Sequence, residues 1–171
     1  MRWHSGVGPL SEDEDGEAGL RFLARVVATE IDLLEQSAKR LLADVEIVIP
    51  STVADWIADV DLSERLDAFV SRYVRLQDTL SQRLIPALLA HRGVAAGSAA
   101  ADLKRAERLG WIDSAEAWLR HLKLHEQMVH EYNEDILDLA DALDTAHQRV
   151  PALLRMARAT LTEIERVLKS G

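Results

Sequence analysis

Three histidines and a tyrosine lie close together in the stretch RHLKLHEQMVHEY, which covers residues 120–132. They are His121, His125, His130 and Tyr132. Histidine exchanges a proton near neutral pH and also binds zinc through its ring nitrogens, so the stretch could hold an acid–base site or a metal site. A polar stripe on a helix that carries no chemistry is the third alternative.

The zinc alternative depends on spacing. The segment HEQMVH differs by one residue from the zinc-protease motif H-E-x-x-H. His125 and His130 are five residues apart, which places them about 140° apart around a regular helix, so they cannot bind one ion together. His121 and His125 have the required spacing of four, but the sequence marks no third ligand. We therefore predict neither a zinc protease nor a metal site.

Long helices must position these residues. All eight glycines lie outside the stretches 20–92 and 111–170, and glycine inside a helix costs about 1 kcal/mol relative to alanine. Apolar residues in both stretches recur at steps of three and four, as in the run from Leu66 to Leu88, which is typical of one face of a helix. The sequence predicts an all-α protein, an up-and-down bundle of four main helices with short helices between them.

The boundaries follow from the same pattern. Three of the main helices are predicted at about 18–44, 62–91 and 135–170. The fourth carries the histidines and is expected to open at a capping box formed by Asp113 and Glu116. Pro86 and Pro151 are expected to kink or bend their helices. The remaining predicted elements are short helices at 51–59 and 99–109 and a connector, VEIVIP, at 45–50.

Composition indicates a cytoplasmic protein. The chain has no cysteine, which is typical of a reducing compartment. Its longest apolar run, LIPALLA at 84–90, is far shorter than the ~20 residues of a membrane helix, so no membrane partner is expected. The first ten residues lack the apolar core of a signal peptide. Residues 1–17 are predicted to be an acidic, disordered tail, and residues 18–171 a single helical domain.

Charge is unevenly distributed along the chain. The net charge is −9, which disfavours a nucleic-acid partner. However, residues 65–125 hold ten Lys and Arg against six Asp and Glu, so positive charge gathers around the histidines. A basic groove would suit a small anionic or RNA substrate better than duplex DNA, and we expect no direct DNA partner. Solvated helix faces of mixed charge explain the distribution equally well.

Four segments together resemble one protein family. MVHEY with its preceding turn is similar to the signature R-x-x-x-x-H-x-Y of the HepT-like toxins, a branch of the HEPN ribonuclease domains. Roughly residues 50–160 are covered by the resemblance. The other three similar segments are RLQDTLSQRLIPALL at 75–89, RAERLGWIDSAEAWL at 105–119 and ALDTAHQRVPALL at 142–154.

The resemblance implies a function. Such proteins are homodimeric helical bundles, encoded with a small nucleotidyltransferase antitoxin of the MNT type. Their paired motifs cut RNA in a dimer cleft without a metal or other cofactor. The antitoxin silences several members by attaching AMP to the motif tyrosine. Carried over to this chain, the motif histidine is His130 and the motif tyrosine, which is also the modification site, is Tyr132.

One motif position departs from the family. His125 stands where the family has its arginine, and Glu126 replaces the asparagine that often follows. RNA cleavage without a metal needs a permanent cation beside the transition-state phosphate, and an unperturbed histidine is mostly neutral at pH 7. Arg120, five residues before His125, could supply this cation. Lys123 and Arg75 are further candidates for binding the substrate.

Three functions therefore remain open at the level of sequence. The first is a ribonuclease toxin that uses His130, His125, Tyr132 and Arg120. The second is a catalytically inactive HepT-like partner of a nucleotidyltransferase. The third is a helical homodimeric scaffold in which the histidines and their neighbours carry no chemistry.

Overall fold

The computed structural model describes residues 12–95, 97–131 and 135–171. In these ranges the chain is helical between short connections and contains no strand, which confirms the predicted all-α class. The elements in chain order are α1 (Glu12–Leu42), α2 (Pro50–Ala58), α3 (Val60–Asp78), the π-helical turn η1 (Thr79–Leu84), α4 (Ile85–His91), α5 (Ala99–Arg108), α6 (Ala115–Glu131) and α7 (Ile136–Lys169).

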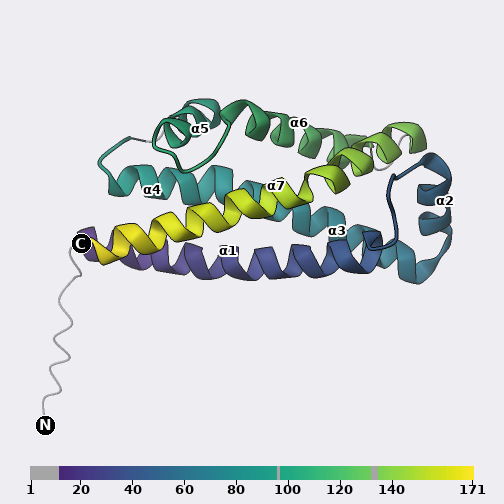
Figure 1. The fold of residues 1–171 in the computed structure, drawn as a ribbon, viewed down its shortest axis with the longest axis horizontal. Helices are drawn as coiled ribbons and strands as arrows, with labels where there is room; N and C mark the ends of the chain where they lie inside the picture. The colour runs from purple at the N-terminus through teal and green to yellow at the C-terminus, as the bar shows by residue number, and fades with distance from the viewer. Residues whose placement is uncertain (1–11, 96, 132–134) are drawn as a thin grey trace, which may run out of the picture.

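Four long elements form an up-and-down bundle, as predicted. They are α1, the rod made of α3, η1 and α4, then α6, and α7, and each runs antiparallel to the next (Figure 1). The bundle closes because α1 contacts both α3 and α7, while α6 contacts α3 and α7. The short helix α2 crosses one end of the bundle, and α5 lies at the other end against α4 and α6 (Figure 1).

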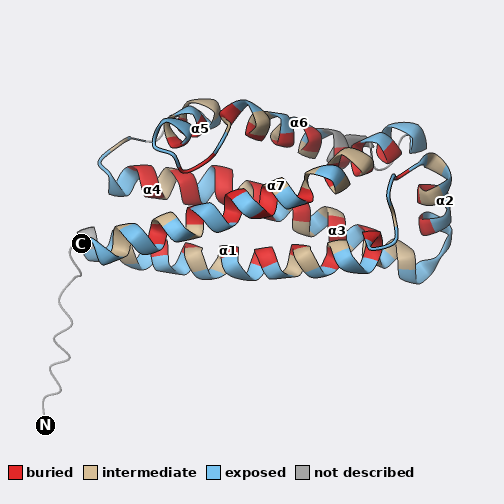
Figure 2. Ribbon diagram, viewed as in Figure 1, coloured by how far each residue is buried: buried red, intermediate tan, exposed pale blue. Residues whose placement is uncertain are grey.

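The predicted apolar stripes face the interior of the bundle (Figure 2). Along the α3–α4 rod, the whole predicted stripe from Leu66 to Leu88 is buried. Trp118 of α6 is the largest fully buried side chain among the described residues. Burial of this kind is what holds helices together in water, at about 25 cal/mol for each Å² of apolar surface. The core therefore fixes how α3 and α6 face one another.

The rod contains a wide turn that the sequence analysis did not predict. In η1, the backbone N–H of Ile85 donates to the carbonyl of Leu80, five residues earlier instead of four. A π turn holds one more residue than an α turn, so it shifts the residues that follow by about 100° around the axis. Pro86, where we predicted a kink, follows this turn directly and has no N–H to donate.

The wide turn keeps the apolar stripe in line with the core. Three successive steps of four residues lead from Leu76 to Leu88, and each would drift about 40° on a regular helix. The extra residue in η1 offsets most of this drift. Leu76, Leu80, Leu84 and Leu88 are accordingly all buried.

The N-terminal boundary was predicted wrongly. α1 begins at Glu12, so its first six residues fall inside the segment that we expected to be a disordered tail. Acidic side chains near the start of a helix interact favourably with its dipole, and Glu17 contacts Arg21 at 3.9 Å. Residues 1–11 lie outside the described part of the chain.

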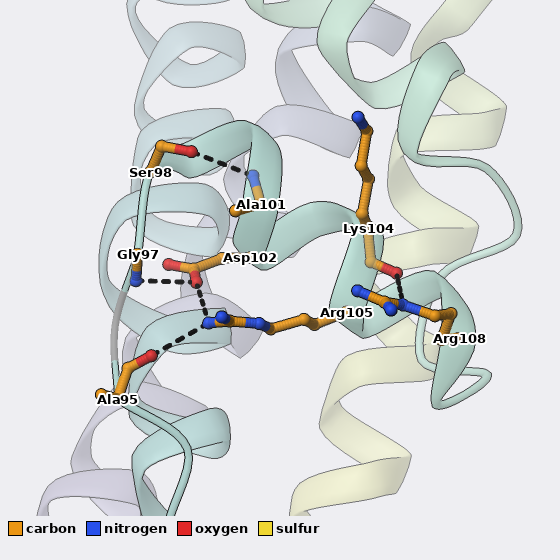
Figure 3. A network of polar contacts seen from close by, with 8 residues as sticks. All are labelled: Ala95, Gly97, Ser98, Ala101, Asp102, Lys104, Arg105 and Arg108. Carbon is orange, nitrogen blue, oxygen red and sulfur yellow. Dashed lines mark hydrogen bonds and ion pairs between the residues drawn. The ribbon is translucent and has the colours of Figure 1, made fainter.

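The connections are held by side chains. In the connector before α2, the backbone N–H of Val48 donates to Asp144 of α7 at 2.9 Å, and His147 lies 2.8 Å from the carbonyl of Val45. The loop before α5 is held by Asp102 and Arg105, which bond the backbone of Gly97 and Ala95 (Figure 3).

Left-handed glycines end two helices. Gly93 and Gly110 both have φ of 77°, a conformation in which a side chain would be strained. The N–H of Gly110 donates to Glu107 and that of Trp111 to Ala106, the paired bonds of a Schellman motif. This turn carries Trp111 into the core and directs the chain toward α6.

The cap of α6 also differs from the prediction. Ser114 accepts a hydrogen bond from the backbone N–H of Ala117 at 3.1 Å, so the capping side chain is Ser114 and not Asp113. The predicted capping box of Asp113 and Glu116 is therefore wrong by one residue. Pro151 lies inside α7 as expected, and the bend predicted there remains a prediction.

Candidate functional site

The histidine-bearing helix α6 packs against α3, α5 and α7. Its buried face is formed by four side chains at steps of three and four residues, which are Trp118, His121, Leu124 and Met128. One of the three histidines therefore belongs to the core, and the helix presents the others in different directions.

His121 links α6 to α3 inside the core. It is 2% exposed, and its Nδ1 lies 3.2 Å from the hydroxyl of Tyr73, which is fully buried. The ring also meets Trp118 edge-on at 6.3 Å. Burial, with the charges of two nearby arginines, lowers the pKa of His121 to about 4, so the ring is neutral at pH 7. His121 has a structural role and not a catalytic one.

His125 faces a carboxylate. Its Nδ1 lies 3.3 Å from Oδ1 of Asp78, the last residue of α3. The His125 side chain is 22% exposed and that of Asp78 38%, so the pair lies at the edge of the core. A protonated His125 would form an ion pair here. Sequence reasoning did not identify Asp78 as its partner.

A groove opens beside this pair. It has a volume of about 510 Å³ and runs along one face of α3 and η1 to Met128 of α6. Arg75, Asp78 and Arg83 are among its lining side chains. A space of this size fits a nucleotide-sized ligand. Arg75, predicted to bind substrate, therefore lies in the groove next to the contact of His125.

A buried carboxyl anchors the wall of the groove. Thr79, the first residue of η1, donates a hydrogen bond to Oε1 of Glu30 on α1 at 3.0 Å. Glu30 is 8% exposed, and burial raises the pKa of its carboxyl, against the opposing effects of the Thr79 bond and of the Arg75 and Arg83 charges. The wide turn of the rod is thus fixed to α1 at the point where the groove passes it.

Arg120 and Lys123 lie elsewhere on α6. Both are exposed, and neither lines the groove. On a regular helix Arg120 is about 140° from His125 and Lys123 about 160°, so neither shares the face of His125. Within one protomer, the cations closest to the His125–Asp78 pair along the groove come from α3 and η1 instead.

The two motif residues proper fall at the edge of the described chain. His130 lies in α6, but its side chain is outside the described residues, and Tyr132 lies outside them altogether. Their predicted roles therefore remain predictions. The part of α6 that leads to them, up to Met128, lies alongside the groove.

The geometry gives His121 and His125 different partners. One contacts Tyr73 and the other Asp78, although their spacing of four would allow a shared ion. Among the residues that the structure describes, no three His, Cys, Asp or Glu side chains gather as a metal site requires.

Two features of the site had a signal in the sequence. Glu30 interrupts the apolar stripe of α1 at a position three after Val27 and four before Leu34, where a carboxylate must be buried. The uninterrupted steps of four from Leu76 to Leu88 indicated a wide turn. Nothing in the sequence pointed to Arg83.

Comparison of the chain with protein-family models, with curated proteins and with solved structures finds no match. In the described part of the chain, no helix has the length and apolar character needed to cross a membrane.

Proposed function

We propose that this protein is a HepT-like toxin, a cytoplasmic and metal-independent RNA endonuclease that acts as a homodimer and is neutralised by an MNT-type nucleotidyltransferase. One observation carries the proposal. The groove lined by Arg75 and Arg83 lies beside the half of α6 that leads to the motif, joined to it by the contact of His125 with Asp78.

The proposed chemistry needs two kinds of group. A general base removes the proton of the ribose 2′-hydroxyl, which attacks the adjacent phosphorus, and a general acid protonates the leaving 5′-oxygen. His130 of the two protomers would serve these steps, with Tyr132 beside it. Arg75 would offset the charge that develops on the phosphate oxygens, because its guanidinium is permanently charged and can bond two oxygens at once.

A second candidate function also has a specific observation in its favour. Asp78 places a carboxylate 3.3 Å from His125, at the position where the family has an arginine. Negative charge beside the phosphate would oppose catalysis. A chain that keeps the fold but not the activity, and serves as a binding partner of the nucleotidyltransferase, fits this feature.

One pair of variants separates the two functions. If the protein is a weakened ribonuclease, His125→Arg combined with Asp78→Asn should increase cleavage of tRNA or mRNA by up to about 100-fold, because a cation is supplied and its competing carboxylate removed. His125→Arg alone should gain less, since Asp78 would hold the new arginine. Cleavage is followed on gels with purified RNA and chelator present.

His130→Ala, made in the double variant, is the control for contaminating nucleases and should abolish the cleavage. The native chain should also arrest growth when it is expressed without the nucleotidyltransferase. If the native chain and the double variant both leave RNA intact, the ribonuclease proposal is wrong and the inactive partner is favoured.

A further inference from the structure

Two hollows meet at Arg75. The groove described above has a neighbour of about 310 Å³, which is lined by Arg25, Glu30 and Arg75 together with apolar residues of α1. Arg75 lines both hollows, and the hydrogen bond from Thr79 to Glu30 links the wall of one to the wall of the other. The two hollows therefore form one surface that extends from α1 across α3 to η1.

The wide turn aligns two arginines on this surface. Arg75 and Arg83 are eight residues apart, which on a regular helix would place them about 80° apart. The extra residue of the π turn makes them equivalent to positions seven apart, within about 20° of each other. Both line the groove, and both act on the carboxyl of Glu30.

These arginines are available to an anion. Among the described residues, Arg25, Arg75 and Arg83 have no carboxylate within ion-pair distance. Asp78 contacts His125, and Glu30 is buried and bonded to Thr79. Groups that a folded protein leaves with positive charge and open donors along a hollow are suited to phosphate.

We infer that Arg25, Arg75 and Arg83 form a phosphate track that holds the backbone of single-stranded RNA along the α1–α3 surface beside α6. The inference rests on the proposed function, which it extends by naming where the strand lies. At about 1.5 Å per residue, Arg75 and Arg83 are at most about 12 Å apart along the rod, so they contact different phosphates of one strand. An extended strand suits an open groove better than a duplex does.

The experiment measures binding separately from cleavage. A fluorescein-labelled 12-nucleotide RNA is titrated with the His130→Ala chain, and anisotropy gives Kd at several salt concentrations. Adding Arg75→Gln or Arg83→Gln should each weaken binding about tenfold. Each should also reduce the salt dependence, the slope of log K against log salt, by about 0.7, because one phosphate contact is lost.

Arg155→Gln is the matched control, since it removes the same charge from an exposed position on α7 that lines neither hollow. It should change Kd less than twofold and leave the slope unchanged. The track is overturned if Arg75→Gln and Arg83→Gln bind like Arg155→Gln, or if the His130→Ala chain does not bind RNA at all. Circular dichroism and thermal unfolding of each variant exclude loss of fold as the cause.

Failure of the track and failure of the proposed function give different results. RNA cleavage by the native chain, with equal binding by the three arginine variants, keeps the function and rejects the track. Binding that depends on Arg75 and Arg83, without cleavage by any variant, keeps the track and rejects the ribonuclease. Sedimentation tests a second copy as the occupant. If the arginine variants shift the monomer–dimer equilibrium and not the RNA affinity, the groove is a subunit interface and the track is wrong.

Discussion

The hydroxyl of Tyr73 and Nδ1 of His121 lie 3.2 Å apart across the contact between α3 and α6. Both side chains are buried, and burial also raises the pKa of Tyr73, so the pair is neutral at physiological pH. The contact joins the helix that lines the groove to the helix that carries the motif. Its energy therefore bears on how firmly the site is held.

Replacing Tyr73 with Phe tests that contribution. The ring would still fill its place, but the ring nitrogen of His121 would lose its partner in a dry environment. We expect the free energy of unfolding to fall by about 1–3 kcal/mol, measured by urea denaturation at pH 7. Thr162→Ala, which removes an exposed side chain–backbone hydrogen bond in α7, should cost clearly less. Equal losses in the two variants would show that the buried pair contributes nothing special.

The same histidine predicts a dependence of stability on pH. The pKa of His121 is about 4 in the folded protein and about 6.5 in an unfolded chain, so the unfolded state binds the proton more readily. Stability from this group is complete above about pH 6.5 and is lost as the pH falls toward 4, by up to about 3 kcal/mol.

Urea denaturation between pH 7.5 and 4.5 measures this loss. His121→Gln cannot titrate, so its stability should fall less steeply over the same range, even if it is lower throughout. Other groups, such as the buried Glu30, titrate in both proteins and cancel in the comparison. Parallel curves for the native chain and His121→Gln would contradict the prediction.

The start of α6 gives a test of helix capping. Ser114→Ala removes the side chain that accepts from the N–H of Ala117, and the free energy of unfolding should fall by about 1 kcal/mol. Asp113→Ala, one residue earlier, is the control and should cost only a few tenths of a kcal/mol, from the helix dipole. Thermal or urea unfolding measures both. The reverse order would mean that Asp113 is the true cap.

Tyr132 gives a prediction about regulation. Co-expression with a nucleotidyltransferase encoded beside this gene should add the mass of one AMP to the chain, as seen by intact mass spectrometry. The chain has only two tyrosines, and Tyr73 is fully buried and bonded to His121, so peptide mapping should place the group on Tyr132. The Tyr132→Phe chain should stay unmodified. Modification that persists in this variant would assign the group to another residue.

Local periodicity was enough to predict the helices and their burial, and not enough to predict the contacts between them. The stripe from Leu66 to Leu88 reports which face of a rod is buried, and the structure confirms it. The meeting of Asp78 with His125 depends on how two helices are rotated and shifted against each other. That arrangement is set by the packing of the whole core, which no single window of sequence contains.

The wide turn of the α3–α4 rod has a consequence for how this gene can vary. Loss of a single codon anywhere within Thr79–Leu84 would restore a regular helix and rotate everything after it by about 100°. Leu88 would leave the interior in the same event that moves Arg83 away from Arg75. Natural variants should therefore tolerate substitutions in this segment more readily than a change in its length.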